Sequence, residues 1–117
     1  MVVVAGGRAV IRLKPGVRLL GIRPEIALAI NVVASVYQAR GHDVVVTSVI
    51  DGVHSRGSEH YAGAAFDCRL NDLPEIDRGA IATDARIALG TDFDVLHEGA
   101  GTPGEHLHVE YDPKVPY

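Results

Sequence analysis

Two adjoining stretches of the sequence decide its fold: Pro24-Glu-Ile-Ala-Leu-Ala-Ile-Asn-Val-Val-Ala-Ser-Val-Tyr-Gln-Ala-Arg-Gly41 and Asp43-Val-Val-Val-Thr-Ser-Val-Ile50. In the first stretch, apolar residues recur at helical spacing. It begins with a proline that suits the first helical position and ends with a glycine that suits the position just after a helix. The second stretch is a β-branched run of strand length. We therefore predict a helix over 24–40 and a central strand directly after it.

The flanking sequence adds further strands. Residues 2–13 contain β-branched clusters around a glycine pair, which predict a short strand or hairpin ended by a turn at Lys14-Pro15-Gly16. Residues 64–70 predict another strand. The segments 93–97 and 106–111 each have strand character, and the glycine-rich turn between them predicts a terminal hairpin.

A second helix is expected between these strands, over about 74–89. Asp72 and Glu75 have capping-box spacing, and Gly90 suits the end of the helix. Small and apolar residues recur there at helical spacing, namely Ile76, Ala80, Thr83 and Ile87. Because strands and helices do not alternate strictly, we predict an α+β fold in which a small antiparallel sheet is flanked by two main helices.

The overall composition limits the classes of function. The chain has 117 residues, of which 47% are hydrophobic and 22% charged, so we expect one globular domain over 1–117 and a monomer. The net charge of −4 and the scattered cations argue against a nucleic-acid partner. The single cysteine, Cys68, cannot form an internal disulfide, and we interpret it as a small core residue.

No apolar run in the sequence is long enough to cross a bilayer. The apolar run at the N-terminus lacks the length and the basic flank of a signal peptide. We therefore expect no integral membrane association and no export signal. A substrate outside the cytoplasm would require another agent to release the protein.

Five of the six histidines lie between positions 54 and 108, most of them close to carboxylates. A tetrahedral catalytic zinc site uses three imidazole or carboxylate ligands and leaves a fourth position for water. His60 in a loop and Asp67 in a strand are separated by a tight glycine-containing connection, so both can bind one metal ion. His106 and His108 share one face of the last predicted strand, and either can supply the third ligand.

The same residues carry a resemblance to a known family. The stretch Ser58-x-His60-x-x-Gly63-x-Ala65-x-Asp67 matches the Ser-x-His-x-x-Gly-x-Ala-x-Asp signature of the M15 zinc peptidases. Glu105-x-x-His108 resembles their second motif, Glu-x-x-His, and the two motifs occur in the family's order. The resemblance covers roughly residues 43–113. It implies a Zn²⁺ site at the strand ends and adjoining loop, with His60, Asp67 and His108 as ligands and Glu105 as the general base.

That family includes D-alanyl-D-alanine dipeptidases and carboxypeptidases, and phage endolysins that cut the L-alanyl-D-glutamate bond of peptidoglycan. In the implied mechanism zinc lowers the pKa of its bound water to around 7 and polarises the scissile carbonyl. Glu105 takes the water proton and passes it to the leaving amine. The spacing of the motif permits this role for Glu105.

One departure from the family concerns the stabilisation of the oxyanion. Many relatives carry an arginine soon after the strand that precedes the first motif, where this chain reads Ser48-Val-Ile-Asp51. Arg56 is the nearest substitute for that arginine. The candidates for substrate contacts are His54, Asp51 and His106. We interpret His97 and Glu98 as solvated hairpin residues.

The sequence thus predicts a zinc-dependent, endolysin-like peptidase that hydrolyses an amide bond in the stem or cross-link peptide of bacterial peptidoglycan. Its short length and lack of an export signal look most like the small phage-type members of the family. We expect it to accumulate in the cytoplasm of a bacterial host before release to the cell wall, or to be associated with the virion. The alternatives are a D-alanyl-D-alanine carboxypeptidase and a non-catalytic, metal-containing module that binds the cell wall.

Overall fold

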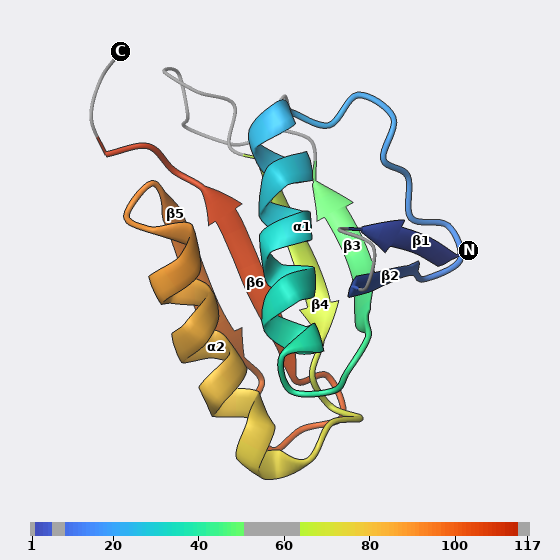
Figure 1. Cartoon of the computed structure of the whole chain (residues 1–117), viewed down its shortest axis with the longest axis vertical. Helices are drawn as coiled ribbons and strands as arrows, with labels where there is room; N and C mark the ends of the chain where they lie inside the picture. Colours follow the sequence, from blue (N-terminus) through green and yellow to red (C-terminus); the bar gives the residue numbers. More distant parts are fainter. Residues whose placement is uncertain (1, 6–8, 51–63, 115–117) are drawn as a thin grey trace.

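The computed structural model describes residues 2–5, 9–50 and 64–114. Within these residues, six strands form one sheet of order β1-β2-β3-β4-β6-β5, and two helices pack together on one face of it (Figure 1). The elements are β1 (Val2–Ala5), β2 (Ala9–Leu13), α1 (Pro24–Gln38), β3 (Val44–Ile50), β4 (Ala64–Arg69), α2 (Glu75–Leu89), β5 (Phe93–Glu98) and β6 (His106–Tyr111). The α+β class, the two helices and the terminal hairpin are as predicted.

The sheet is mixed, so the prediction of an antiparallel sheet was wrong for one strand pair. β2 pairs with β3 in parallel, with Leu13 opposite Val46, whereas the other pairs between described strands are antiparallel. The reason is the connection: α1 joins β2 to β3 and packs against both, so the chain returns to enter β3 in the direction of β2.

Helix α1 forms where the sequence predicts it, and it supplies one half of the core. Pro24 occupies the start of the helix. The buried positions recur at helical spacing and extend to Tyr37, whose hydroxyl donates to the backbone oxygen of Arg69 at 3.0 Å. Gly41 has a φ of 81°, which an L side chain rarely adopts, and this ends the helix and turns the chain into β3.

Helix α2 also lies where it was predicted, but it buries the opposite side. Ile76 and Ile87 are 84% and 77% exposed, and the buried positions are Ile81, Ala82 and Ala85. Pro74 precedes the helix without a side-chain cap, so the expected capping box is not formed. Two of these three buried residues are alanines. The face of α2 that packs on the sheet therefore lacks the large apolar side chains by which a buried helix face is recognised in a sequence.

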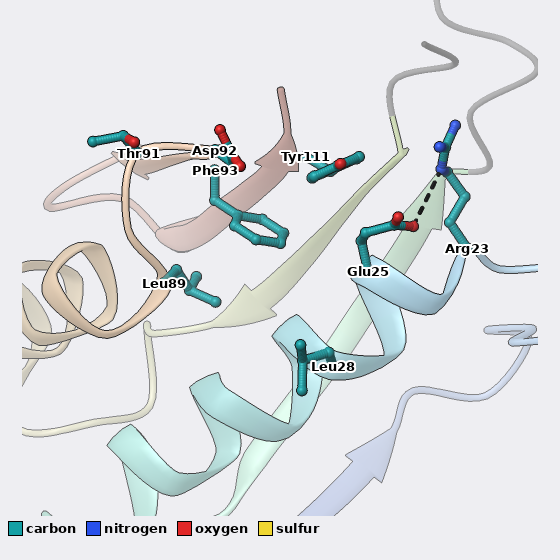
Figure 2. A pocket seen from close by; sticks show the side chains of 8 residues that line it. All are labelled: Arg23, Glu25, Leu28, Leu89, Thr91, Asp92, Phe93 and Tyr111. Atoms are coloured by element: carbon teal, nitrogen blue, oxygen red, sulfur yellow. Dashed lines mark ion pairs between the residues drawn. The ribbon is translucent and has the colours of Figure 1, made fainter. Parts of the chain in front are cut away.

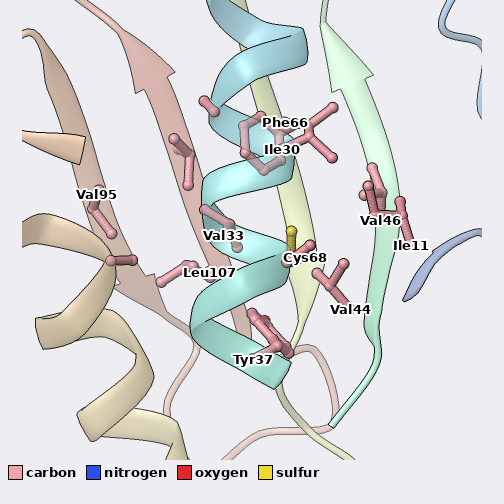
Figure 3. Packing of buried hydrophobic residues seen from close by; sticks show 14 of the residues in the cluster. Ile11, Ile30, Val33, Tyr37, Val44, Val46, Phe66, Cys68, Val95 and Leu107 are labelled. Carbon is pink, nitrogen blue, oxygen red and sulfur yellow. The ribbon is translucent and has the colours of Figure 1, made fainter. Parts of the chain in front are cut away.

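The core lies between the helices and one face of the sheet (Figure 3). In β4, Phe66 and Cys68 are fully buried on this face, which confirms Cys68 as a core residue. Asp67 alternates with them and therefore lies on the other face of the sheet. Fully burying a side chain such as Phe66 contributes about 1.5–3 kcal/mol, so this face carries most of the stability of the sheet. Neither of the described helices is both long and apolar enough to cross a membrane.

Candidate functional site

The structure brings Asp67 and His108 together on the face of the sheet away from the helices. The two residues are 41 positions apart in the sequence but stand directly opposite each other on the paired strands β4 and β6. Nδ1 of His108 lies 2.7 Å from Oδ1 of Asp67. Its Nε2 lies 3.3 Å from a carboxylate oxygen of Glu110, two positions along the same strand face.

The second oxygen of Asp67 is bound by Ser48, which the sequence analysis did not single out. The register between β3 and β4 shifts between Val46 and Ser48, and beyond the shift Ser48 pairs with Asp67. The serine hydroxyl donates to Oδ2 of Asp67 at 3.0 Å. A β-bulge of this kind redirects side chains at one point of a strand, and no motif in the sequence predicted it.

The short contact between Asp67 and His108 changes the pKa of both groups. Burial acts to raise the pKa of Asp67, but the hydrogen bonds from His108 and Ser48 outweigh it, so the pKa is lowered and the carboxylate stays ionised. The hydrogen bond to Asp67 raises the pKa of His108 to about 9, with partial burial opposing it and Glu110 adding to it. Without a metal, the pair is therefore an ion pair at neutral pH.

His106 lies on the same strand face as His108, as predicted. Its Nδ1 is 2.8 Å from the backbone oxygen of Gly104, and its Nε2 is 3.0 Å from Glu98. Nε2 also lies 4.0 Å from Oδ2 of Asp67. The hydrogen bond to Gly104 raises the pKa of His106, and the nearby carboxylates of Asp67 and Glu98 add to this effect against the desolvation. His106 is therefore placed beside the Asp67–His108 pair and in reach of it.

Glu105 is buried, with 4% of its surface exposed, and its carboxylate makes three hydrogen bonds. Oε1 accepts from Nη1 of Arg78 at 2.8 Å and from the backbone nitrogen of Gly101 at 3.3 Å. Oε2 lies 2.6 Å from Nε2 of His97. The bond to His97 is the main reason that the pKa of Glu105 is lowered, and Gly101 and Arg78 add to it.

The sequence did not predict these partners of Glu105. His97 was expected to be a solvated hairpin residue, and this was wrong: only 22% of its side chain is exposed, because it lies on the side of β5 that faces the helices and contacts Glu105. Arg78 comes from α2 and also donates to the backbone oxygens of Leu73 and Asn71. It thus joins the loop before α2 to the carboxylate at the start of β6.

Glu105 and the open-face residues meet at one hollow. A cavity of about 290 Å³ is lined by Asp67, Arg69, Glu105 and His106, with Lys14 and Thr47 at another side. Glu105 directly precedes β6 and stands two positions before the buried Leu107, so it continues the row of residues that faces the helices. Because Glu105 stands at the start of the strand, it also lines the hollow together with Asp67 and His106.

Four predicted site residues, Asp51, His54, Arg56 and His60, lie outside the described residues. Among the residues that the structure does describe, no group of three or more histidine, cysteine, aspartate or glutamate side chains is arranged to hold a metal ion. The donors of Asp67 and His108 suit zinc in type, because a carboxylate oxygen and an imidazole nitrogen are both common zinc ligands. These two side chains stand close enough to serve one ion together with a further ligand.

Another hollow lies on the helix side of the sheet (Figure 2). It has a volume of about 560 Å³ between the start of α1 and the end of α2. Leu28, Leu89 and Phe93 give it apolar walls, and Arg23 and Glu25 form an ion pair of 3.6 Å at its rim. None of the predicted site residues that the structure describes lines it, so it carries no argument for the chemistry of the motifs.

The described site therefore consists of an ionised Asp67–His108 pair supported by Ser48, with His106 beside it and a buried, ion-paired Glu105 at the adjoining hollow. In this set the carboxylates of Asp67 and Glu105 are ionised, so each can accept a proton. No protein-family model, curated protein or solved structure gives a significant match to the chain, so its function is inferred from its own residues.

Proposed function

We propose that this protein is a zinc-dependent peptidase that hydrolyses an amide bond in the peptide of bacterial peptidoglycan, in the manner of the M15 family that its motifs resemble. The proposed zinc ligands are His60, Asp67 and His108, and Glu105 is the proposed general base. An endopeptidase of the endolysin type is the preferred form, and a D-alanyl-D-alanine carboxypeptidase is its nearest alternative.

The observation that carries the proposal is the pairing of Asp67 with His108. One residue ends the first motif and the other ends the second, and 41 positions separate them. The strand register nevertheless places them opposite each other, with 2.7 Å between a carboxylate oxygen and an imidazole nitrogen. Two motifs that merely occurred by chance would have no reason to join their ligand residues in this way.

Each residue of the pair has a defined task in this proposal. Asp67 and His108 bind the metal together with His60, and Ser48 holds Asp67 in place by its hydrogen bond to Oδ2. Because His108 is protonated when it faces Asp67 alone, metal binding displaces its proton. Zinc, when bound, supplies the Lewis acid that activates water at neutral pH and polarises the scissile carbonyl.

Glu105 is the group that moves the proton. Its lowered pKa keeps the carboxylate ionised at neutral pH, so it is ready to accept a proton from the attacking water and to deliver it to the leaving amine. Both of its oxygens are engaged, by Arg78 and by His97. Proton transfer therefore requires Oε2 to exchange its contact with His97 for water, while Arg78 keeps hold of Oε1.

The engaged state of Glu105 also favours a second candidate function. In a non-catalytic module that binds the cell wall, Glu105 would serve only to join α2, β5 and the start of β6 through Arg78 and His97. The two functions differ in what happens when the charge of Glu105 is removed. In a peptidase, removing this charge lowers the rate of cleavage. In a binding module, it lowers only the stability of the fold.

The test combines metal content with cleavage of purified cell wall. Wild type and His60→Ala, prepared without a histidine tag, are analysed by elemental mass spectrometry, and we expect about one zinc per chain in wild type and its loss in the variant. Glu105→Gln should keep the zinc and lower the cleavage rate by about 10²–10⁴-fold. The matched control is Glu75→Gln, an exposed carboxylate at the start of α2, which should leave the rate unchanged.

The products identify the bond that is cut. New amino termini within the peptide, detected by mass spectrometry, support the endopeptidase, and release of D-alanine without an internal cut supports the carboxypeptidase. A Glu105→Gln variant that cleaves as fast as wild type would refute the proposed base. A chain that binds no zinc when zinc is supplied would refute the metallopeptidase.

A further inference from the structure

The cations of the described chain fall into two groups. Most have partners among the described residues: Arg12 pairs with Asp43, Arg40 with Asp77 and Asp84, Arg78 with Glu105, and Lys114 with Asp94 and Asp112. The side chains of Lys14, Arg18 and Arg69 make no hydrogen bond or ion pair with any residue in the described part of the chain. The chain has a net charge of −4, so cations without a partner among the described residues stand out.

The three unpaired cations lie along one groove. Lys14 and Arg69 line the hollow of about 290 Å³ that contains Asp67 and Glu105. Lys14 also lines a neighbouring hollow of about 450 Å³, together with Arg18. Thr47 is likewise common to the two hollows, so they adjoin across the start of the bulge in β3.

The fold fixes Lys14 at the junction of the two hollows. Ile11 and Leu13 of β2 are buried against the helices, so the alternation of the strand directs Lys14 to the opposite face, where Asp67 lies. The backbone nitrogen of Lys14 donates to the oxygen of Val46 at 2.9 Å, which ties this residue to β3 next to the bulge. The turn after it then brings Arg18 to the same hollow.

The hollow of about 450 Å³ has the chemistry of a site for a carboxylate on a short chain. Among the described residues, its lining includes the two cations Lys14 and Arg18 and no acidic side chain. Val17 and Val49 give it apolar surface beside the two charges. It also includes Ser48, which binds Asp67, so a ligand that fills it lies next to the proposed metal ligands.

We infer that Lys14 and Arg18 form a subsite that binds a carboxylate of the peptide substrate, about one residue away from the bond that is cut. Arg69 adds positive charge in the adjoining hollow that contains Asp67. This inference rests on the proposed peptidase function, since it assigns the subsite to that substrate. The occupant is a peptide that bears a carboxylate next to a small apolar residue. The subsite gives preference for acidic over amidated peptides.

The test measures binding rather than cleavage, so that it can fail independently of the proposed function. The ligands are two synthetic peptides, L-alanyl-γ-D-glutamyl-L-lysine and the same peptide with the α-carboxylate of D-glutamate converted to the amide. Both are titrated into Glu105→Gln protein by calorimetry at low ionic strength. We expect the acidic peptide to bind about tenfold more tightly, as a charge-assisted contact with exposed cations allows.

Substitutions in the groove test whether Lys14 and Arg18 cause this preference. In the same Glu105→Gln background, Lys14→Ala and Arg18→Ala should each remove most of the preference and leave the affinity for the amidated peptide unchanged. The matched control is Arg12→Ala, which removes a cation from the same strand that is already paired with Asp43. It should keep the tenfold preference.

The outcomes separate the inference from the function on which it rests. Equal affinity for the two peptides, a preference that survives in Lys14→Ala and Arg18→Ala, or no binding of either peptide at millimolar concentration would overturn the subsite. A preference that depends on Lys14 and Arg18 in a protein that cleaves no cell wall would support the subsite and refute the peptidase. In an active enzyme, Lys14→Ala should raise KM for the acidic peptide about tenfold with little change in kcat.

Discussion

The two faces of strand β6 differ in chemistry although their residues alternate along one backbone. Leu107 and Val109 are fully buried against the helices, whereas His106 and His108 stand on the open face beside Asp67. Because side chains of a strand alternate between its two faces, neighbouring residues of β6 belong either to the core or to the candidate site. A substitution on one face should change the stability of the fold, and a substitution on the other should change the site.

Glu105 is the exception to this division, and it shows how a charge can occupy the packed row. It alternates with Leu107 but carries a carboxylate, which is tolerated there because Arg78 and His97 bind both of its oxygens. An ion pair in such a place fixes geometry more than it adds stability. The start of β6 is therefore held in position by polar contacts, and the rest of the strand by apolar ones.

The largest expected effect on stability comes from the packed face. Phe66→Ala removes a fully buried ring from the centre of the core and should lower the free energy of unfolding by about 3–5 kcal/mol. Asp67→Ala, one residue further on the open face, removes the hydrogen bonds to His108 and Ser48 and should cost about 1.5–3 kcal/mol in metal-free protein. Urea unfolding with both variants measures the difference. Equal losses would show that the two faces do not divide as described.

Much of the fold could be predicted from the sequence because local signals agreed with it. The helical spacing after Pro24, the β-branched run before Ile50 and the glycine-rich turn of the last hairpin each correspond to an observed element. The parallel pairing of β2 with β3 could not be predicted in this way, because it depends on how α1 packs back on the sheet. The buried side of α2 was missed because alanines make up most of it.

The site was predictable only where its residues form a motif. Asp67 and His108 were identified from the two motifs that resemble those of a known family, and their contact across 41 positions is a property of the strand register. Arg78 and Ser48 belong to no motif: one is an arginine of a helix, and the other depends on a bulge in β3. Such supporting residues become visible only when distant elements are placed together.

A smaller effect concerns the pH dependence of the open face in metal-free protein. The pKa of His108 is raised from 6.5 to about 9, so its contribution to stability is complete below about pH 6.5 and is lost as the pH rises through 9. The pKa of Asp67 is lowered, so its contribution is present above its ordinary pKa and is lost as the pH falls below it.

The difference in unfolding free energy between wild type and His108→Gln should therefore be largest between about pH 4 and 6.5. It should amount to about 1.5–3 kcal/mol there and shrink toward pH 9. Urea unfolding in the presence of a chelator, repeated across this range, measures it. A difference that stays constant with pH would mean that Asp67 and His108 do not form an ion pair in the absence of metal.

The smallest effect is expected for a charge outside both the core and the groove. Arg12 and Asp43 form an ion pair of 3.0 Å, but their side chains are 50% and 37% exposed, so water and salt screen the attraction. Arg12→Ala should lower the free energy of unfolding by about 0.2–1 kcal/mol, and by less at high salt. A loss of several kcal/mol in urea unfolding would contradict this expectation. It would also show that the exposed cations of β2 and the turn after it hold the fold together, in which case Lys14→Ala could not be interpreted as a change in ligand binding alone.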